Sequence, residues 1–209
     1  PTEYGSPIHK GRYSVGDATV VSRLRAAGAV IFGKTVSTEF ATTQAGPTCN
    51  PHNTAHTPGG SSSGSGVAVA RGIVSFSLGT DTAGSGRVPA AFNHLIGFKP
   101  TKGRWSTHGL VPACRSIDCI TVFTDALIDA QAVDAVLAGF DAEDAFSKPL
   151  ANVPINSHRI GVPRRDQRVF FGDTQAEFLY ERALAVLARD SAIVEIDIAP
   201  LLEAARLLY

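Results

Sequence analysis

Apolar residues are spaced along the chain in two ways, at the 3.6-residue period of a helix and in short uninterrupted runs typical of buried strands. After Asp17, a residue type that caps helices, the apolar residues from Val20 to Ala27 share one helical face until Gly28 ends the helix. Together the two patterns predict helices at 17–28, 64–71, 125–137, 174–189 and 200–209, and strands at 29–32, 73–78, 119–123 and 159–162.

The order of these elements predicts an α/β fold, with helices packed on a largely parallel or mixed β-sheet. In the 174–189 helix we expect Phe178, Leu184 and Leu187 to face inward. Residues 141–158 contain prolines, asparagines and mixed charges and predict a loop. Because the alternation continues beyond this loop, we interpret residues 1–209 as one domain.

Two glycine-rich segments that carry serines, 59–66 and 79–87, flank the apolar run at 73–78. Ser85 follows this predicted strand and precedes a stretch in which Pro89 suits the first turn of a helix. A corner between a strand and a helix exposes its side chain, and glycines beside it let the backbone approach a ligand closely. The segments therefore indicate serine chemistry.

The backbone N–H groups of Thr82, Ala83, Gly84 and Ser85 can converge on one oxygen atom, which is the geometry of an oxyanion hole. Asp81 and Arg87 flank this turn. We expect them to form an ion pair or backbone hydrogen bonds that support the shape of the turn rather than to take part in chemical steps.

The two serine loops, with Ser61 in the first and Ser85 in the second, resemble those of the amidase signature family. Residues 97–104, 109–119 and 159–163 and the terminus at 207–209 are similar to the allophanate hydrolase branch of that family. Residues 33–41 and 50–53 are more similar to general amidases. The resemblance covers nearly the whole chain.

The resemblance implies an α/β/α sandwich with a mixed β-sheet core, truncated here at both ends. It also implies amide hydrolysis by a Ser–cis-Ser–Lys triad, in which Ser85 is the nucleophile and Ser61 passes its proton to a lysine expected upstream of Pro1. In the allophanate branch the substrate is the carboxylate allophanate, which is hydrolysed to ammonia and carbon dioxide, and Tyr209 resembles the tyrosine that contacts it. A general amidase of broader substrate range is the alternative, and a non-catalytic scaffold is another.

Two short motifs indicate other chemistry. Residues 28–35 fit the nucleotide-binding pattern G-x-x-x-x-G-K-[ST], but a helix precedes them and the residues between the glycines are strand-like, so the required context is missing. Residues 60–64 fit G-x-S-x-G, which would make Ser62 the nucleophile of an α/β-hydrolase with Asp118 or Asp125 and His158. The preceding residues are polar and contain a proline, so no strand leads into that serine.

Composition narrows the class of partner. The chain has 209 residues, 44% of them hydrophobic, and a formal net charge of +0, which gives no electrostatic footprint for nucleic acid. Three cysteines without C-x-x-C spacing predict neither a disulfide framework nor a metal cluster and suit the cytoplasm. No apolar run approaches the roughly 18 residues of a membrane span.

We therefore expect an enzyme that acts on a small-molecule amide without a cofactor or metal, as a homodimer when full length. Lys34, Lys99 and Lys102 lie where strands end or turns begin, so we expect none of them to be the base. The 209-residue piece alone is then expected to be inactive.

Overall fold

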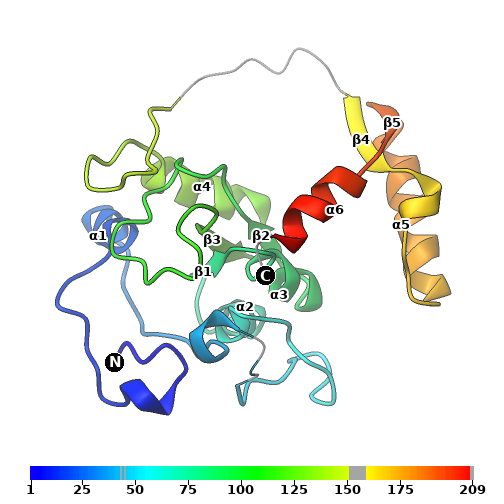
Figure 1. Ribbon diagram of the computed structural model, residues 1–209. Coiled ribbons are helices and arrows are strands. Elements are labelled where there is room, and N and C mark those ends of the chain that lie inside the picture. The colour runs from blue at the N-terminus through cyan, green and yellow to red at the C-terminus, as the bar shows by residue number, and fades with distance from the viewer. Residues whose placement is uncertain (43, 45, 151–158, 208–209) are drawn as a thin grey trace. The chain divides into compact units, whose positions relative to one another are not determined.

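The computed structural model describes residues 1–42, 44, 46–150 and 159–207. The chain divides into two compact units, Pro1–Ala151 and Asn152–Tyr209, and each is described by itself (Figure 1). The division falls in the loop that the sequence predicts at 141–158. The interpretation of residues 1–209 as one partial domain stays a prediction.

The first unit is built on a three-stranded antiparallel sheet. Its strands are β1 (Phe76–Asp81), β2 (Ile96–Phe98) and β3 (Cys119–Thr124), in the order β1-β3-β2. All six residues of the central strand β3 are buried. Asp81, the last residue of β1, pairs with Cys119, the first of β3.

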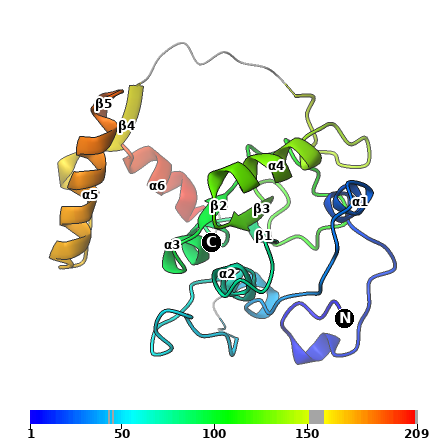
Figure 2. The ribbon, with the colours of Figure 1, turned by 180° about the vertical axis from the view of Figure 1, so that it is seen from behind.

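Helices cover both faces of this sheet. The side chains of β3 alternate between the two faces, so each face presents apolar residues to a helix layer. Ile120 and Val122 pack into a core with α1 (Thr19–Ala26) and α4 (Leu127–Leu137). Phe123 packs on the other face with α2 (Ser63–Ala70) and α3 (Arg87–Phe92). Figure 2 shows α4 and α2 on opposite sides of the strands. Of two short 3-10 helices, η1 (Pro7–His9) precedes α1, and η2 (Glu39–Ala41) lies between α1 and α2.

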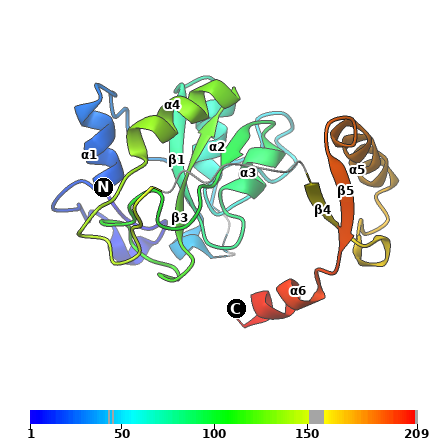
Figure 3. The same cartoon turned by 90° about the horizontal axis from the view of Figure 1, so that it is seen from above.

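The second unit contains a parallel pair of strands, β4 (Arg159–Pro163) and β5 (Ala192–Ile196), joined through α5 (Thr174–Leu187) (Figure 3). The 3-10 helix η3 (Arg165–Gln167) follows β4, and α6 (Ala199–Arg206) follows β5. The side chain of Arg168, 8% exposed, donates to Glu181 of α5 and Glu195 of β5 at 2.8 Å each. This unit supplies the parallel pairing.

The α/β class that the sequence predicts is confirmed, with helix layers on a sheet and both parallel and antiparallel pairs in the chain. The elements α2, β3, α4, β4, α5 and α6 lie within a few residues of their predicted positions. No helix in the described ranges is long and apolar enough to cross a membrane.

The strand predicted at 29–32 is wrong. Val30 and Phe32 are 89% and 77% exposed, and within the described residues no strand pairs with this segment. The strand predicted at 73–78 begins later, at Phe76, and Ile73 before it is exposed. The sequence left open a largely parallel or a mixed sheet, and in the first unit both partners of β3 run antiparallel to it.

Two predictions about helix surfaces fail for local reasons. Asp17 does not cap α1, because the helix begins at Thr19 after Ala18 and the Asp17 carboxylate instead pairs with Arg25 at 2.6 Å. In α5, Leu184 is half-buried, but Phe178 is 60% and Leu187 43% exposed, so only one of the three residues expected to face inward is even partly covered.

Candidate active site

The corner that carries Ser85 lies between the end of β1 at Asp81 and the start of α3 at Arg87. Ser85 is half-buried, and the glycines on either side allow its position. Gly84 has a φ of +128°, where side chains are strained, and a Cβ on Gly86 would lie 2.5 Å from Oγ1 of Thr121 on β3. The corner therefore needs glycine at both positions.

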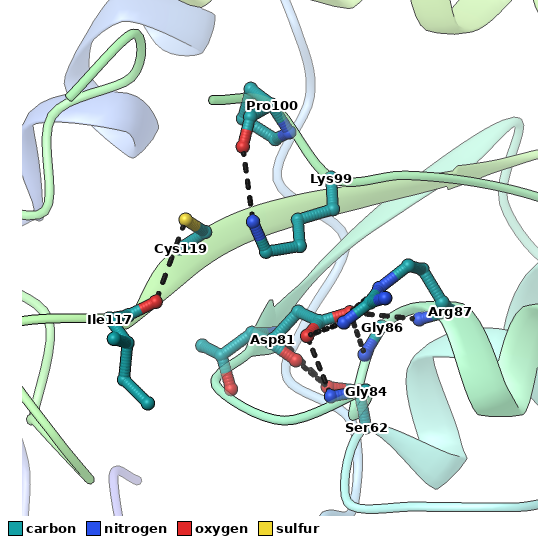
Figure 4. Close-up of polar contacts among 10 residues, drawn as sticks. Ser62, Asp81, Gly84, Gly86, Arg87, Lys99, Pro100, Ile117 and Cys119 are labelled. Carbon is teal, nitrogen blue, oxygen red and sulfur yellow. Dashed lines mark hydrogen bonds and ion pairs between the residues drawn. The ribbon is translucent and has the colours of Figure 1, made fainter. Parts of the chain in front are cut away.

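The carboxylate of Asp81 fixes the shape of this corner. Asp81 is fully buried, and its two oxygens accept hydrogen bonds from the backbone N–H groups of Gly84 (2.7 Å), Gly86 (3.3 Å) and Arg87 (3.2 Å). The Arg87 guanidinium adds two more, at 2.9 and 3.0 Å (Figure 4). The ion pair that the sequence allowed for is thus present, and it encloses the turn.

Burial by itself would raise the pKa of Asp81, but the hydrogen bonds from the Arg87 side chain and from the Arg87 and Gly84 backbones outweigh it. The pKa of Asp81 is therefore held below its ordinary value, and the pKa of Arg87 is raised, chiefly by its hydrogen bond to Asp81. The pair stays charged at neutral pH, as a support of the turn requires.

The second serine loop lies directly against this corner. The backbone N–H of Ser62 donates to the carbonyl of Ser85 at 3.3 Å, and the carbonyl of Ser61 accepts from the N–H of Thr38 at 3.0 Å. The peptide bond between Gly60 and Ser61 is cis, and Ser61 is 5% exposed. The fold thus brings together the two serine segments that the sequence singled out.

The hydroxyl of Ser62 is occupied by the end of β1. It donates to the carbonyl of Thr80 at 3.2 Å and accepts from the N–H of Thr80 at 3.1 Å. No strand precedes it in residues 54–59. Ser62 is therefore a structural serine, and the α/β-hydrolase interpretation is wrong in its nucleophile.

Asp118, one of the two acids considered for that interpretation, has structural partners. Asp118 is 2% exposed and accepts hydrogen bonds from Thr82, Ala113 and Cys114. His158 lies outside the described residues. In the sequence, Asp118 was a candidate only for this rejected interpretation, and its contact with Thr82 was missed. The position of Asp118 directly before the predicted strand at 119–123 was a signal that it lies at the end of that strand.

The four amides predicted for an oxyanion hole are not equally available to a ligand. The N–H of Gly84 donates to Asp81, so in this structure it is not available to an oxyanion. Among the described residues, the N–H groups of Thr82, Ala83 and Ser85 donate to no protein acceptor. Thr82, Ala83 and Ser85 therefore remain as candidate donors.

The three lysines considered as the base, Lys34, Lys99 and Lys102, each donate to a protein oxygen. Nζ of Lys34 is exposed and donates to Oγ1 of Thr2 at 2.8 Å. Nζ of Lys102 donates to two backbone carbonyls, of Arg115 and Asp118, at 2.8 Å each and lies 4.3 Å from the centre of the Phe146 ring. Lys99 is half-buried, with its Nζ 3.5 Å from the Pro100 carbonyl (Figure 4). The first two arrangements suit a protonated ammonium.

Tyr209, expected to contact a substrate carboxylate, lies outside the described residues. In the ranges that the structure describes, no three His, Cys, Asp or Glu side chains are grouped so that they could hold a metal ion.

Comparison with known proteins identifies the class. The family model described as Amidase matches residues 1–209, and the chain therefore belongs to the amidase family. The resemblance stated from the two serine loops is confirmed.

Individual relatives include a urea amidolyase, an allophanate hydrolase and an amidotransferase subunit. A urea amidolyase of Lachancea kluyveri is 46% identical over 222 residues, which cover 100% of this chain and 12% of that protein. A solved structure of the allophanate hydrolase of Kluyveromyces lactis superimposes with a TM-score of 0.93 at 45% identity, covering 100% of this chain and 36% of that one. A glutamyl-tRNA(Gln) amidotransferase chain of Salinibacter ruber is 44% identical over 167 residues, 77% of this chain and 32% of that protein. The chain thus spans about a third or less of these relatives.

Proposed function

We propose that the full-length protein hydrolyses a C–N amide bond through an acyl-enzyme on Ser85. The observation that carries this proposal is the contact between the two serine loops, in which the Ser62 N–H donates to the Ser85 carbonyl beside a turn held by a buried carboxylate. Such a turn keeps a nucleophile in one geometry, which is the condition for an effective attack on a carbonyl.

We assign to Ser61 the transfer of the proton from Ser85 to a lysine. Serine is a weak nucleophile and needs an adjacent base. A lysine can serve as that base only where burial or a neighbouring cation keeps it neutral. Lys34 and Lys102 do not suit the role, because one is exposed and the other donates to two carbonyls. We propose a lysine upstream of Pro1 as this base, by analogy with the amidase signature family that the serine loops resemble.

The N–H groups of Thr82, Ala83 and Ser85 are the proposed donors to the tetrahedral oxyanion. Each such donor contributes about 3 kcal/mol to transition-state stabilisation in enzymes where one has been removed. The amine then leaves, and water hydrolyses the acyl-enzyme.

We propose allophanate as the substrate, with ammonia and carbon dioxide as the products. The support is the 45–46% identity, over the whole chain, to proteins named allophanate hydrolase and urea amidolyase. Tyr209 is the proposed contact of the substrate carboxylate. We further propose a homodimer in the cytoplasm that uses no cofactor.

A general amidase of broader range is the second candidate. It is favoured by residues 33–41, which resemble general amidases, and by the 44% identity to the amidotransferase chain. The choice between the two depends on the substrate and leaves the roles of Ser85 and Ser61 unchanged.

The test compares wild-type full-length protein with the variants Ser85→Ala and Ser75→Ala. Ser75 is exposed and lies outside the serine loops, so its variant is a matched control for loss of a hydroxyl. We expect ammonia release from allophanate to fall by more than about 10³-fold in Ser85→Ala and to stay unchanged in Ser75→Ala. Cleavage of a simple aryl amide at a higher kcat/KM than allophanate would favour the general amidase. Wild-type protein that cleaves neither would favour the non-catalytic scaffold.

A further inference from the structure

Asp118 is a buried carboxylate that the proposed mechanism does not use. It is 2% exposed, and the hydrogen bonds that compensate its charge come from neutral groups of two separate segments. A buried carboxylate is expensive without such partners. The donors of these hydrogen bonds therefore indicate which segments of the chain Asp118 holds in position.

The position of Asp118 follows from the strand register. β1 and β3 part after the pair formed by Asp81 and Cys119, so Thr82 and Asp118 face each other as the first residues beyond the sheet. Oγ1 of Thr82 donates to Oδ1 of Asp118 at 2.5 Å. The contact thus closes the end of the sheet at the point where the serine corner begins.

On its other side Asp118 holds a turn of its own loop. The N–H of Ala113 donates to Oδ2 at 3.0 Å, and the N–H of Cys114 lies 3.0 Å from both oxygens. The N–H of Asp118 donates back to the Cys114 carbonyl at 2.9 Å, and Lys102 donates to the Asp118 carbonyl. The 113–118 turn is therefore a fixed support, and Thr82 is tied to it.

The two buried carboxylates divide the serine corner between them. Asp81 holds its far end, at Gly84, Gly86 and Arg87. Asp118 holds its near end, because Thr82 makes its one side-chain hydrogen bond within the described residues to this carboxylate. Ala83, whose free N–H is a candidate oxyanion donor, lies between the two anchors.

We propose that Asp118 is a positioning residue for the reaction of Ser85. Through the hydroxyl of Thr82 it fixes the 82–85 segment, so that the Ala83 and Ser85 amides meet the developing oxyanion in one geometry. This inference rests on the proposed amide hydrolysis. It predicts that Asp118 affects turnover more than substrate binding, because the oxyanion exists only in the transition state.

The experiment uses full-length protein with Asp118→Asn, Thr82→Val and the double variant. Thr82→Val keeps the size of the side chain and leaves Asp118 to close its own turn, so it tests the tether even where Asp118→Asn is poorly stable. Asp144→Asn is the matched control. Asp144 is 8% exposed and likewise accepts three hydrogen bonds, from Thr107 and Phe146, and within the described residues none of its hydrogen bonds comes from the serine corner.

We expect Thr82→Val and Asp118→Asn each to lower kcat by about 10- to 100-fold while KM changes by less than about threefold, as a small misplacement of catalytic groups does. The double variant should be no slower than the slower single variant, because both changes remove one tether. Asp144→Asn should keep kcat within about twofold of wild type. Hydrogen exchange of amides 82–86 should accelerate in the first two variants and stay unchanged in β3.

Two outcomes overturn the inference, and they are distinguishable. A wild-type protein that hydrolyses no amide overturns the proposed function and this inference with it. An active wild type whose Thr82→Val and Asp118→Asn variants keep kcat within about threefold, with unchanged exchange at 82–86, overturns this inference alone.

Discussion

Replacing Asp81 by asparagine removes the support of the serine corner at its most buried point. Asp81 is fully buried, whereas the Arg87 side chain is 56% exposed, so loss of the carboxylate charge leaves Arg87 in contact with solvent. The loss in free energy of unfolding therefore comes from the hydrogen bonds that the carboxylate accepts. Oδ1 accepts two of them, from Gly84 and Arg87, and Oδ2 accepts three, from Gly86 and Arg87.

An asparagine can present only one oxygen, and its amide group is itself a donor. In either orientation of the side chain at least two of these hydrogen bonds are replaced by a donor facing a donor. A buried donor without an acceptor costs about 1–3 kcal/mol. With at least two such donors, we expect Asp81→Asn to lower the free energy of unfolding of the first unit by about 2–6 kcal/mol.

The assay is denaturant-dependent hydrogen exchange at the amides of β3 in full-length protein at pH 7, because β3 is the buried centre of this unit. Asp17→Asn is the control, since Asp17 pairs with Arg25 at 2.6 Å but both side chains are more than a third exposed. That exposed pair should contribute less than about 1 kcal/mol. Equal losses in the two variants would refute the reasoning that burial and backbone donors make Asp81 the support of the corner.

Three further outcomes are expected. Ser61→Ala should slow turnover at least about 100-fold. Ser63→Ala, which loses one 3.5 Å contact to the Val36 carbonyl, should slow turnover much less. Equal small effects of the two variants in steady-state kinetics would show that the serine run is structural. Hydrogen bonds from Ser106 and Thr19 lower the pKa of Asp141 from 3.8 to about 2. The contribution of the Asp141 carboxylate to the free energy of unfolding is therefore complete above pH 3.8 and is lost as the pH falls toward 2. In Asp141→Asn the free energy of unfolding should fall less steeply across that range, and an unchanged slope would contradict the assignment. Gly86→Ala should destabilise by about 1–3 kcal/mol because its Cβ would meet Thr121, whereas Gly16→Ala, with open space around it, should be neutral in the same denaturation measurement.

Local pattern was sufficient for the elements whose periodicity matched their burial. The apolar run at 119–123 predicted β3, all six residues of which are buried. The helix predicted at 125–137 corresponds to α4, whose buried residues Ala130, Val133 and Leu137 recur at helical spacing. The corner at Ser85 was predicted because glycines stand on both sides of it, and the structure requires glycine at both positions.

Long-range pairing could not be predicted from local pattern. An apolar run such as 29–32 looks like a strand whether or not a partner strand lies beside it, and here it has none within the described residues. The direction of β3 relative to β1, which places Asp118 opposite Thr82, depends on chain topology. The assignment of Gly84 to an oxyanion hole failed for a similar reason, because the acceptor of its N–H is the side chain of Asp81, whose direction the sequence does not specify.

Covalent trapping tests the central claim most directly. Full-length protein is incubated with a hydroxyl-directed acylating probe, digested, and analysed by mass spectrometry for the modified residue. The account predicts one adduct on Ser85, stoichiometric with loss of amide hydrolysis, and none in Ser85→Ala. An adduct on Ser62, or amide hydrolysis that persists in Ser85→Ala, would contradict it.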